Sequence, residues 1–87
     1  MKKKTIDYKA LVLQTEKNLI PILGEKQTDY LMMGCGDNSA VCMREFHPEL
    51  DASSEEYEKA VWEWVYMSIS GELEAINAPE EAFKAIA

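Results

Sequence analysis

Side chains that bind metals or attack substrates are scarce in this sequence of 87 residues, which has two cysteines, Cys35 and Cys42, and one histidine, His47. A structural zinc site uses four sulfur or nitrogen ligands, and a catalytic cysteine needs a neighbouring base. The spacing of these residues matches no standard zinc motif. We expect two buried, reduced thiols, no cofactor, no metal and no enzymatic activity. A small thiol- or metal-dependent protein that uses Cys35, Cys42 and His47 is an alternative.

Long apolar runs are also missing. No run approaches the roughly 20 residues that cross a bilayer. The lysines at positions 2–4 resemble the start of a secretion signal, but Thr5, Asp7 and Lys9 follow where that signal needs an apolar run. The sequence therefore predicts a soluble, cytoplasmic protein that does not bind a membrane.

Positive charge is sparse in the C-terminal part of the chain. Residues 1–50 carry equal numbers of acidic and basic side chains, so the whole net charge of −7 belongs to residues 51–87. Direct binding to nucleic acid normally uses a basic patch, and no such patch is predicted here. A basic partner is favoured instead.

The composition that remains is globular, with 47% hydrophobic and 29% charged residues. We expect one small domain over residues 1–87, whose thin core would benefit from self-association. An N-terminal helix is predicted to begin with Thr5 as its cap. Its apolar positions recur at steps of three and four residues and continue past Pro21, which predicts a kinked helix that reaches toward Gly24. A helix that ends near Leu19 is the alternative.

Two short apolar runs within residues 29–46 flank Gly36, Asp37 and Asn38, residue types that tolerate tight turns. This pattern predicts a β-hairpin over residues 29–46. A short helix over residues 40–46 is the alternative, because methionine favours helix over strand.

The densest aromatic and acidic stretch, residues 53–76, predicts one long helix. Ser53 and Glu56 form a capping box at its start, and the apolar period continues through Gly71. Asn77 with Glu80 marks the start of a short C-terminal helix. The predicted fold class is α+β, made of an N-terminal helix, a β-hairpin, a long acidic helix and a short C-terminal helix. An all-α bundle is the alternative.

The long helix has more apolar surface than one modest core needs, because its apolar arc spans roughly 200° instead of a stripe somewhat over 100°. Tryptophan and tyrosine are enriched in interface cores. We therefore expect a homodimer, or contact with a basic protein partner, through this helix. The alternative is that both tryptophans pack inside one monomer. The predicted interaction residues are Tyr57, Trp62, Trp64, Tyr66, Glu55, Glu56 and Glu63.

The sequence thus favours a non-enzymatic interaction or regulatory module that associates with itself through the long helix. The glutamates of this helix also suit an alternative of phage or mobile-element origin. In that alternative the acidic surface mimics DNA and inhibits a nucleic-acid-binding protein by occupying its basic groove.

Overall fold

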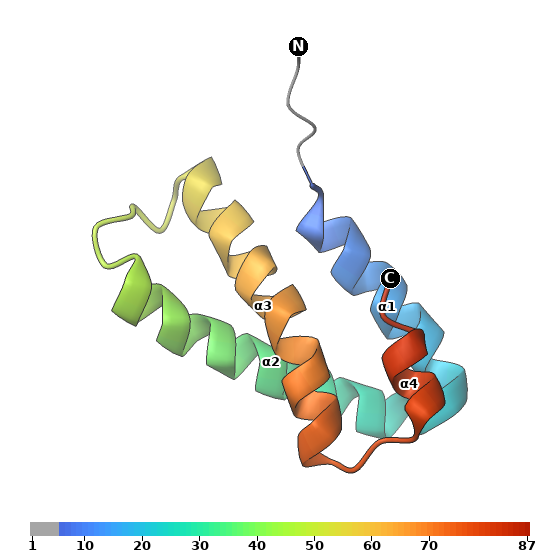
Figure 1. The fold of residues 1–87 in the computed structure, drawn as a ribbon. Helices are drawn as coiled ribbons and strands as arrows, with labels where there is room; N and C mark the ends of the chain where they lie inside the picture. The colour runs from blue at the N-terminus through green and yellow to red at the C-terminus, as the bar shows by residue number, and fades with distance from the viewer. Residues whose placement is uncertain (1–5) are drawn as a thin grey trace.

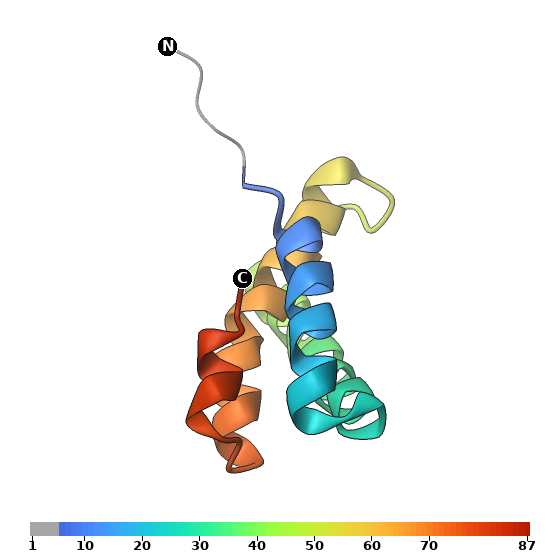
Figure 2. The same ribbon diagram turned by 90° about the vertical axis from the view of Figure 1, so that its right-hand side faces the viewer.

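The computed structural model describes residues 6–87 and shows four helices. They are α1 (Tyr8–Leu23), α2 (Glu25–Phe46), α3 (Glu55–Ala75) and α4 (Glu80–Lys84). α3 crosses in front of α2 and makes its largest contact with it, and α1 lies beside both (Figure 1). The short α4 returns to pack against α1 and α3. In the view turned by 90°, α4 lies beside the C-terminal end of α3, and the start of α2 lies on the opposite side of the molecule (Figure 2).

The predicted β-hairpin is wrong. Residues 29–46 belong to the single helix α2, and the described part of the chain, residues 6–87, contains no strand. The fold class is therefore all-helical, which agrees with the alternative prediction of an all-α bundle. Gly36, Asp37 and Asn38, which predicted a turn, are exposed residues inside the helix.

α2 forms because it buries one face that includes two hydroxyl residues. Its buried positions are Thr28, Leu31, Cys35, Ser39 and Met43, which recur at steps of three and four residues. Thr28 Oγ1 donates a hydrogen bond to Gly24 O at 2.8 Å, and Ser39 Oγ donates to Val61 O of α3 at 2.8 Å. Since both hydroxyls have partners, their burial costs little. A purely hydrophobic pattern does not reveal this face.

α1 confirms the helical prediction for the N-terminal part and shifts its start. The expected cap Thr5 lies outside the described residues. The structure uses Asp7 instead, whose carboxylate accepts a hydrogen bond from Ala10 N at 3.1 Å. The helix continues through the exposed Pro21 and ends at Gly24, whose φ of 88° suits a residue without a side chain.

The long helix is confirmed as α3, which begins one residue later than the capping box predicted. Ser54 is the N-cap, and its Oγ accepts a hydrogen bond from Tyr57 N at 3.1 Å. Ser53 instead donates its N–H and hydroxyl to the Asp51 carboxylate, and these two hydrogen bonds lower the pKa of Asp51. As predicted, α3 runs through Gly71.

Asn77 ends α3 rather than starting the last helix. Its φ is 54°, and its N–H donates to Glu74 O while the N–H of Ala78 donates to Leu73 O, both at 3.0 Å. This is the Schellman arrangement, in which a left-handed residue satisfies the last carbonyls of a helix. α4 then begins at Glu80, after Pro79 as N-cap.

The last residues are fastened to α1 and α3. Asn18 Nδ2 donates to Ala85 O at 3.0 Å, and Ala87 N donates to Thr15 Oγ1 at 2.9 Å. The hydroxyl of Tyr66 donates to Ala87 O at 2.7 Å. Both ribbon views show the C-terminus beside α1 (Figures 1 and 2). The buried core lies between all four helices and comprises Val12, Leu19, Leu31, Cys35, Val65, Ile69, Leu73 and Ala82.

Candidate protein-interaction surface

A stripe of mostly apolar residues runs along the solvent side of α3. At 100° per residue its members fall within an arc of about 80°, opposite to the buried Val65, Ile69 and Leu73. We name it, together with Phe46 of α2, the Trp64 surface. Its α3 members are Tyr57, Ala60, Trp64, Met67, Gly71 and Ala75. Met67 is 62% exposed, so this stripe is not part of the core.

An aromatic stack forms part of the Trp64 surface where the C-terminal end of α2 meets the middle of α3. The rings of Phe46 and Trp64 are nearly parallel, with an interplanar angle of 16° and centroids 5.3 Å apart. The His47 ring lies 6.4 Å from that of Trp64 in a tilted arrangement. Phe46 lies beyond the buried Met43 at the end of α2, where the core ends, and it remains 59% exposed. Trp64 itself is half-buried, so the stack presents the Phe46 ring and part of Trp64 to solvent.

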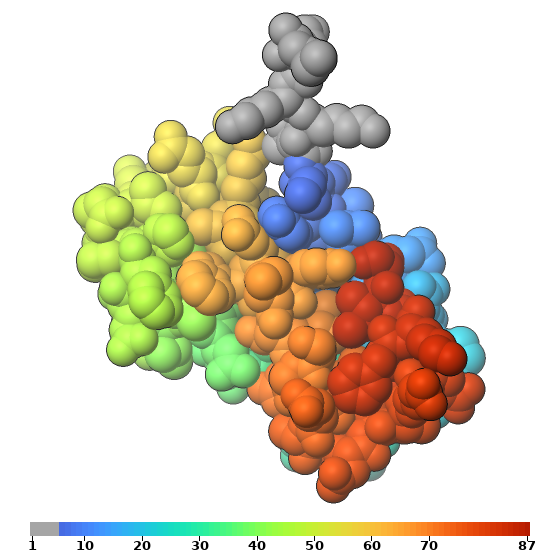
Figure 3. Space-filling view, viewed as in Figure 1, coloured from blue at the N-terminus to red at the C-terminus, as the bar shows by residue number. Residues whose placement is uncertain are grey.

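Three carboxylates border the Trp64 surface on one side. Glu56, Glu63 and Glu74 are exposed, and each lies about 20° to 40° round the helix from Met67. Figure 3 views the face on which α3 lies in front of α2, and the surface of α3 there is continuous with that of the C-terminal end of α2. The result is an apolar strip with an acidic edge.

A separate cleft lies between α1 and α3 around Trp62. Its volume is about 680 Å³, and Tyr8, Lys9, Trp62 and Glu55 are among its lining residues. The Lys9 ammonium lies 5.8 Å from the centroid of the Trp62 ring, within the range of a cation–π contact. The Lys9 side chain already covers Trp62. The cleft therefore offers a partner a less apolar surface than the Trp64 surface does.

The seven residues predicted for interaction do not form one surface. Tyr57, Trp64, Glu56 and Glu63 lie on or along the Trp64 surface. Trp62, Tyr66 and Glu55 instead lie on the side of α3 that faces α1. There Tyr66 packs against Tyr8, with ring centroids 5.6 Å apart, and Trp62 and Glu55 line the cleft. Glu63 borders both regions.

Phe46 and Met67 are the surface residues that the sequence reasoning missed. Phe46 was assigned to a strand, and its place beside Trp64 follows only once α2 is a helix that ends there. Met67 carried a signal of its own, because it lies three residues after Trp64 and therefore on the same side of the helix. A large apolar residue at that spacing, away from the buried arc, indicates an exposed apolar stripe.

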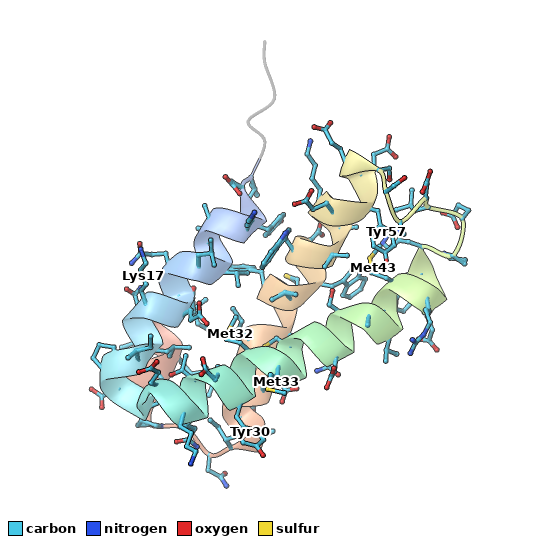
Figure 4. The ribbon with its side chains drawn as sticks, turned by 180° about the vertical axis from the view of Figure 1, so that it is seen from behind. Lys17, Tyr30, Met32, Met33, Met43 and Tyr57 are labelled. Atoms are coloured by element: carbon cyan, nitrogen blue, oxygen red, sulfur yellow. The ribbon has the colours of Figure 1, made fainter. Side chains whose placement is uncertain are left out.

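The outer face of α2 also exposes apolar side chains. Tyr30 is 75% and Met33 66% exposed. Met33 projects from the outer side of α2 (Figure 4), whereas Tyr30 lines a second cleft with Glu72 and Ile76 at the C-terminal end of α3. No stacked aromatic partner accompanies them among the described residues. Exposed apolar residues of this kind are common on folded proteins.

The thiol and histidine candidates do not come together. Cys35 and Cys42 lie on the same helix and are separated by seven residues, which is roughly 10 Å along the axis and too far for a disulfide. His47 follows the end of that helix. Burial, with a smaller effect of the Glu72 charge, raises the pKa of Cys35 to about 12, so its thiol is protonated and unreactive. Residues 6–87 contain no cluster of three potential metal ligands.

A scan of protein-family models, a search of curated proteins and a search of solved structures each find no match to this chain. Within residues 6–87, no helix combines the length and apolar character that crossing a bilayer requires.

Proposed function

We propose that this protein is a non-enzymatic interaction module of the cytoplasm that docks another protein on its Trp64 surface. The observation that supports this function is the stack of the exposed Phe46 on the half-buried Trp64, continued by the exposed Met67 along α3. Aromatic residues and methionine are enriched in the cores of protein interfaces, and tryptophan is prominent among residues whose truncation weakens binding most.

The stack suits this role because it is already ordered. Immobilising a side chain on binding costs conformational entropy, and that cost is smaller where neighbouring rings already restrict each other. The apolar area that Phe46 and Met67 expose would contribute about 25 cal/mol per Å² when a partner covers it. Small residues beside them, such as Ala60 and Gly71, allow a partner to approach the helix closely.

Site-specific photo-crosslinking in cells of the natural source tests this function. A benzophenone side chain placed at Met67 or Phe46 is expected to capture the same protein from both positions. The control is Lys17, an exposed residue of α1 away from the Trp64 surface (Figure 4). A product at twice the mass of the chain would identify a homodimer as the form that this function takes. Equal or absent capture from all three positions would contradict the proposal.

A further inference from the structure

The following inference rests on the proposed function and specifies the partner. We infer that the Trp64 surface binds a basic amphipathic helix of another protein, with apolar residues on Trp64 and Met67 and lysine or arginine residues facing the acidic edge. Amphipathic helices commonly bind in this way, with their apolar side on an apolar strip.

The charges along the strip favour a basic occupant. Glu56, Glu63 and Glu74 follow one another along one side of α3 at intervals of seven and eleven residues, which are about two and three helical turns. Basic residues at the same intervals on a partner helix lying alongside would each face one carboxylate. The apolar strip and its acidic edge thus match the two sides of one basic helix.

Gly71 supports close packing of a helix on this strip. A Cβ atom added at Gly71 would meet nothing within 4 Å, so the fold of this chain does not require a glycine there. Glycine is also a poor helix former. Its absent side chain leaves room beside Trp64 and Met67 for a large apolar residue of the partner.

A second copy of the chain fits less well. In an antiparallel two-fold pair with α3 facing α3, each side of the strip faces the same side of the other copy. The acidic edge with Glu63 and Glu74 would then face the same carboxylates. Each copy also carries a net charge of −7, and like charges across an interface oppose association.

Binding to designed peptides tests the inference. The protein carries Trp62→Phe, so that Trp64 is its only tryptophan and its fluorescence reports on the surface. The probes are an amphipathic helical peptide of leucine and lysine, about 18 residues or five turns long, and the same peptide with glutamate in place of lysine. We expect the lysine peptide to shift the Trp64 emission and bind with a Kd on the order of micromolar. Added salt should weaken this binding.

Matched variants locate the peptide. The triple variant Glu56→Gln, Glu63→Gln and Glu74→Gln should raise the Kd of the lysine peptide roughly tenfold. The control is Asp29→Asn, Asp37→Asn and Glu49→Gln, which removes the same charge from exposed residues outside α3.

A second pair of variants tests the apolar part of the strip. Met67→Ser should weaken binding of the lysine peptide. Met33→Ser, which changes a similarly exposed methionine on the outer face of α2, should leave that binding unchanged. Circular dichroism confirms that every variant is folded.

The outcomes separate the inference from the proposed function. Equal binding of the two peptides, or equal effects of the two carboxylate triples, overturns the basic helix as partner. If the lysine peptide fails to bind while sedimentation shows a dimer that Met67→Ser dissociates, the inference fails and the proposed function stands. If there is neither peptide binding nor a dimer, and Met67 and Phe46 crosslink nothing in cells, both fail.

Discussion

Gly34 of α2 and Glu72 of α3 are in contact where the two helices pack. A Cβ atom at position 34 would lie 2.8 Å from Glu72 Oε1, closer than Cβ contacts in folded proteins. Asn38 Nδ2 donates a hydrogen bond to the same oxygen at 2.9 Å. The missing side chain at Gly34 therefore lets the Glu72 carboxylate lie across α2 and bind Asn38.

The first prediction compares two glycines of α2. Gly36→Ala should raise the free energy of unfolding by about 1 kcal/mol, because alanine favours helix and the new Cβ meets open space. Gly34→Ala should raise it less, because the carboxylate must move and lose Asn38. In a Glu72→Ala background Gly34→Ala should recover the gain of about 1 kcal/mol. Urea unfolding measures the stability of Gly36→Ala, Gly34→Ala, Glu72→Ala and the double variant. Equal increases in stability from the two glycine substitutions in the wild-type background would refute the contact.

The second prediction concerns stability at high pH. The pKa of Cys35 is raised from 9.0 in an unfolded chain to about 12 in the folded one. The folded thiol keeps its proton where the unfolded thiol loses it. Its contribution to stability is therefore complete below pH 9 and is lost as the pH rises toward 12, by up to about 1.4 kcal/mol per pH unit.

Comparison with Cys35→Ala isolates this effect, because the two proteins share every other ionisable side chain. The stability difference between wild type and variant should be constant from pH 7 to 8.5 and should shrink above pH 9. Urea unfolding at each pH measures it. A difference that stays constant to pH 10.5 would show that the thiol is not held protonated.

The third prediction tests the aromatic stack. Phe46→Leu and Trp64→Leu should each lower stability, and a double-mutant cycle should give a coupling of about 1 kcal/mol, as expected for an aromatic pair. The matched control is the cycle between Tyr30→Leu and Trp64→Leu, because Tyr30 lies near the start of α2 and Phe46 at its end. A Phe46 coupling no larger than the Tyr30 coupling would mean that the rings do not stabilise each other.

The fourth prediction follows from the left-handed conformation of Asn77. Asn77→Gly should preserve or raise stability, because glycine adopts a positive φ at no steric cost. Asn77→Val should lower stability by about 2 kcal/mol, because a β-branched residue is strained there. Thermal unfolding would detect the difference. Similar melting temperatures for the two variants would argue against a Schellman end of α3.

Three of the four helices could be predicted from the sequence because their apolar residues repeat at helical spacing. α2 could not, since two of its five buried positions, Thr28 and Ser39, are polar and count as core only when their hydrogen-bond partners are known. Gly34 and Gly36 added to the error. Their residue type indicates a turn, whereas the reason for Gly34 is the Glu72 carboxylate on a distant part of the chain.

The Trp64 surface was predictable in part. The wide apolar arc of the long helix predicted more apolar surface than one core covers, and Met67 with the half-buried Trp64 lies opposite the buried Val65 and Ile69. It did not show that Trp62 would be covered by Lys9, or that Phe46 would stack on Trp64. Both facts depend on how neighbouring helices pack, which the spacing within one helix does not determine.

The hydrogen bond between Thr15 and Ala87 joins positions 72 residues apart. The packing of α2 on α3, by contrast, connects helices that follow each other directly along the chain. Closing a long loop costs more entropy than closing a short one, and local contacts form faster. The order of assembly should therefore begin with the pair α2 and α3, and the fastening of residues 85–87 onto α1 should be among the last steps of folding.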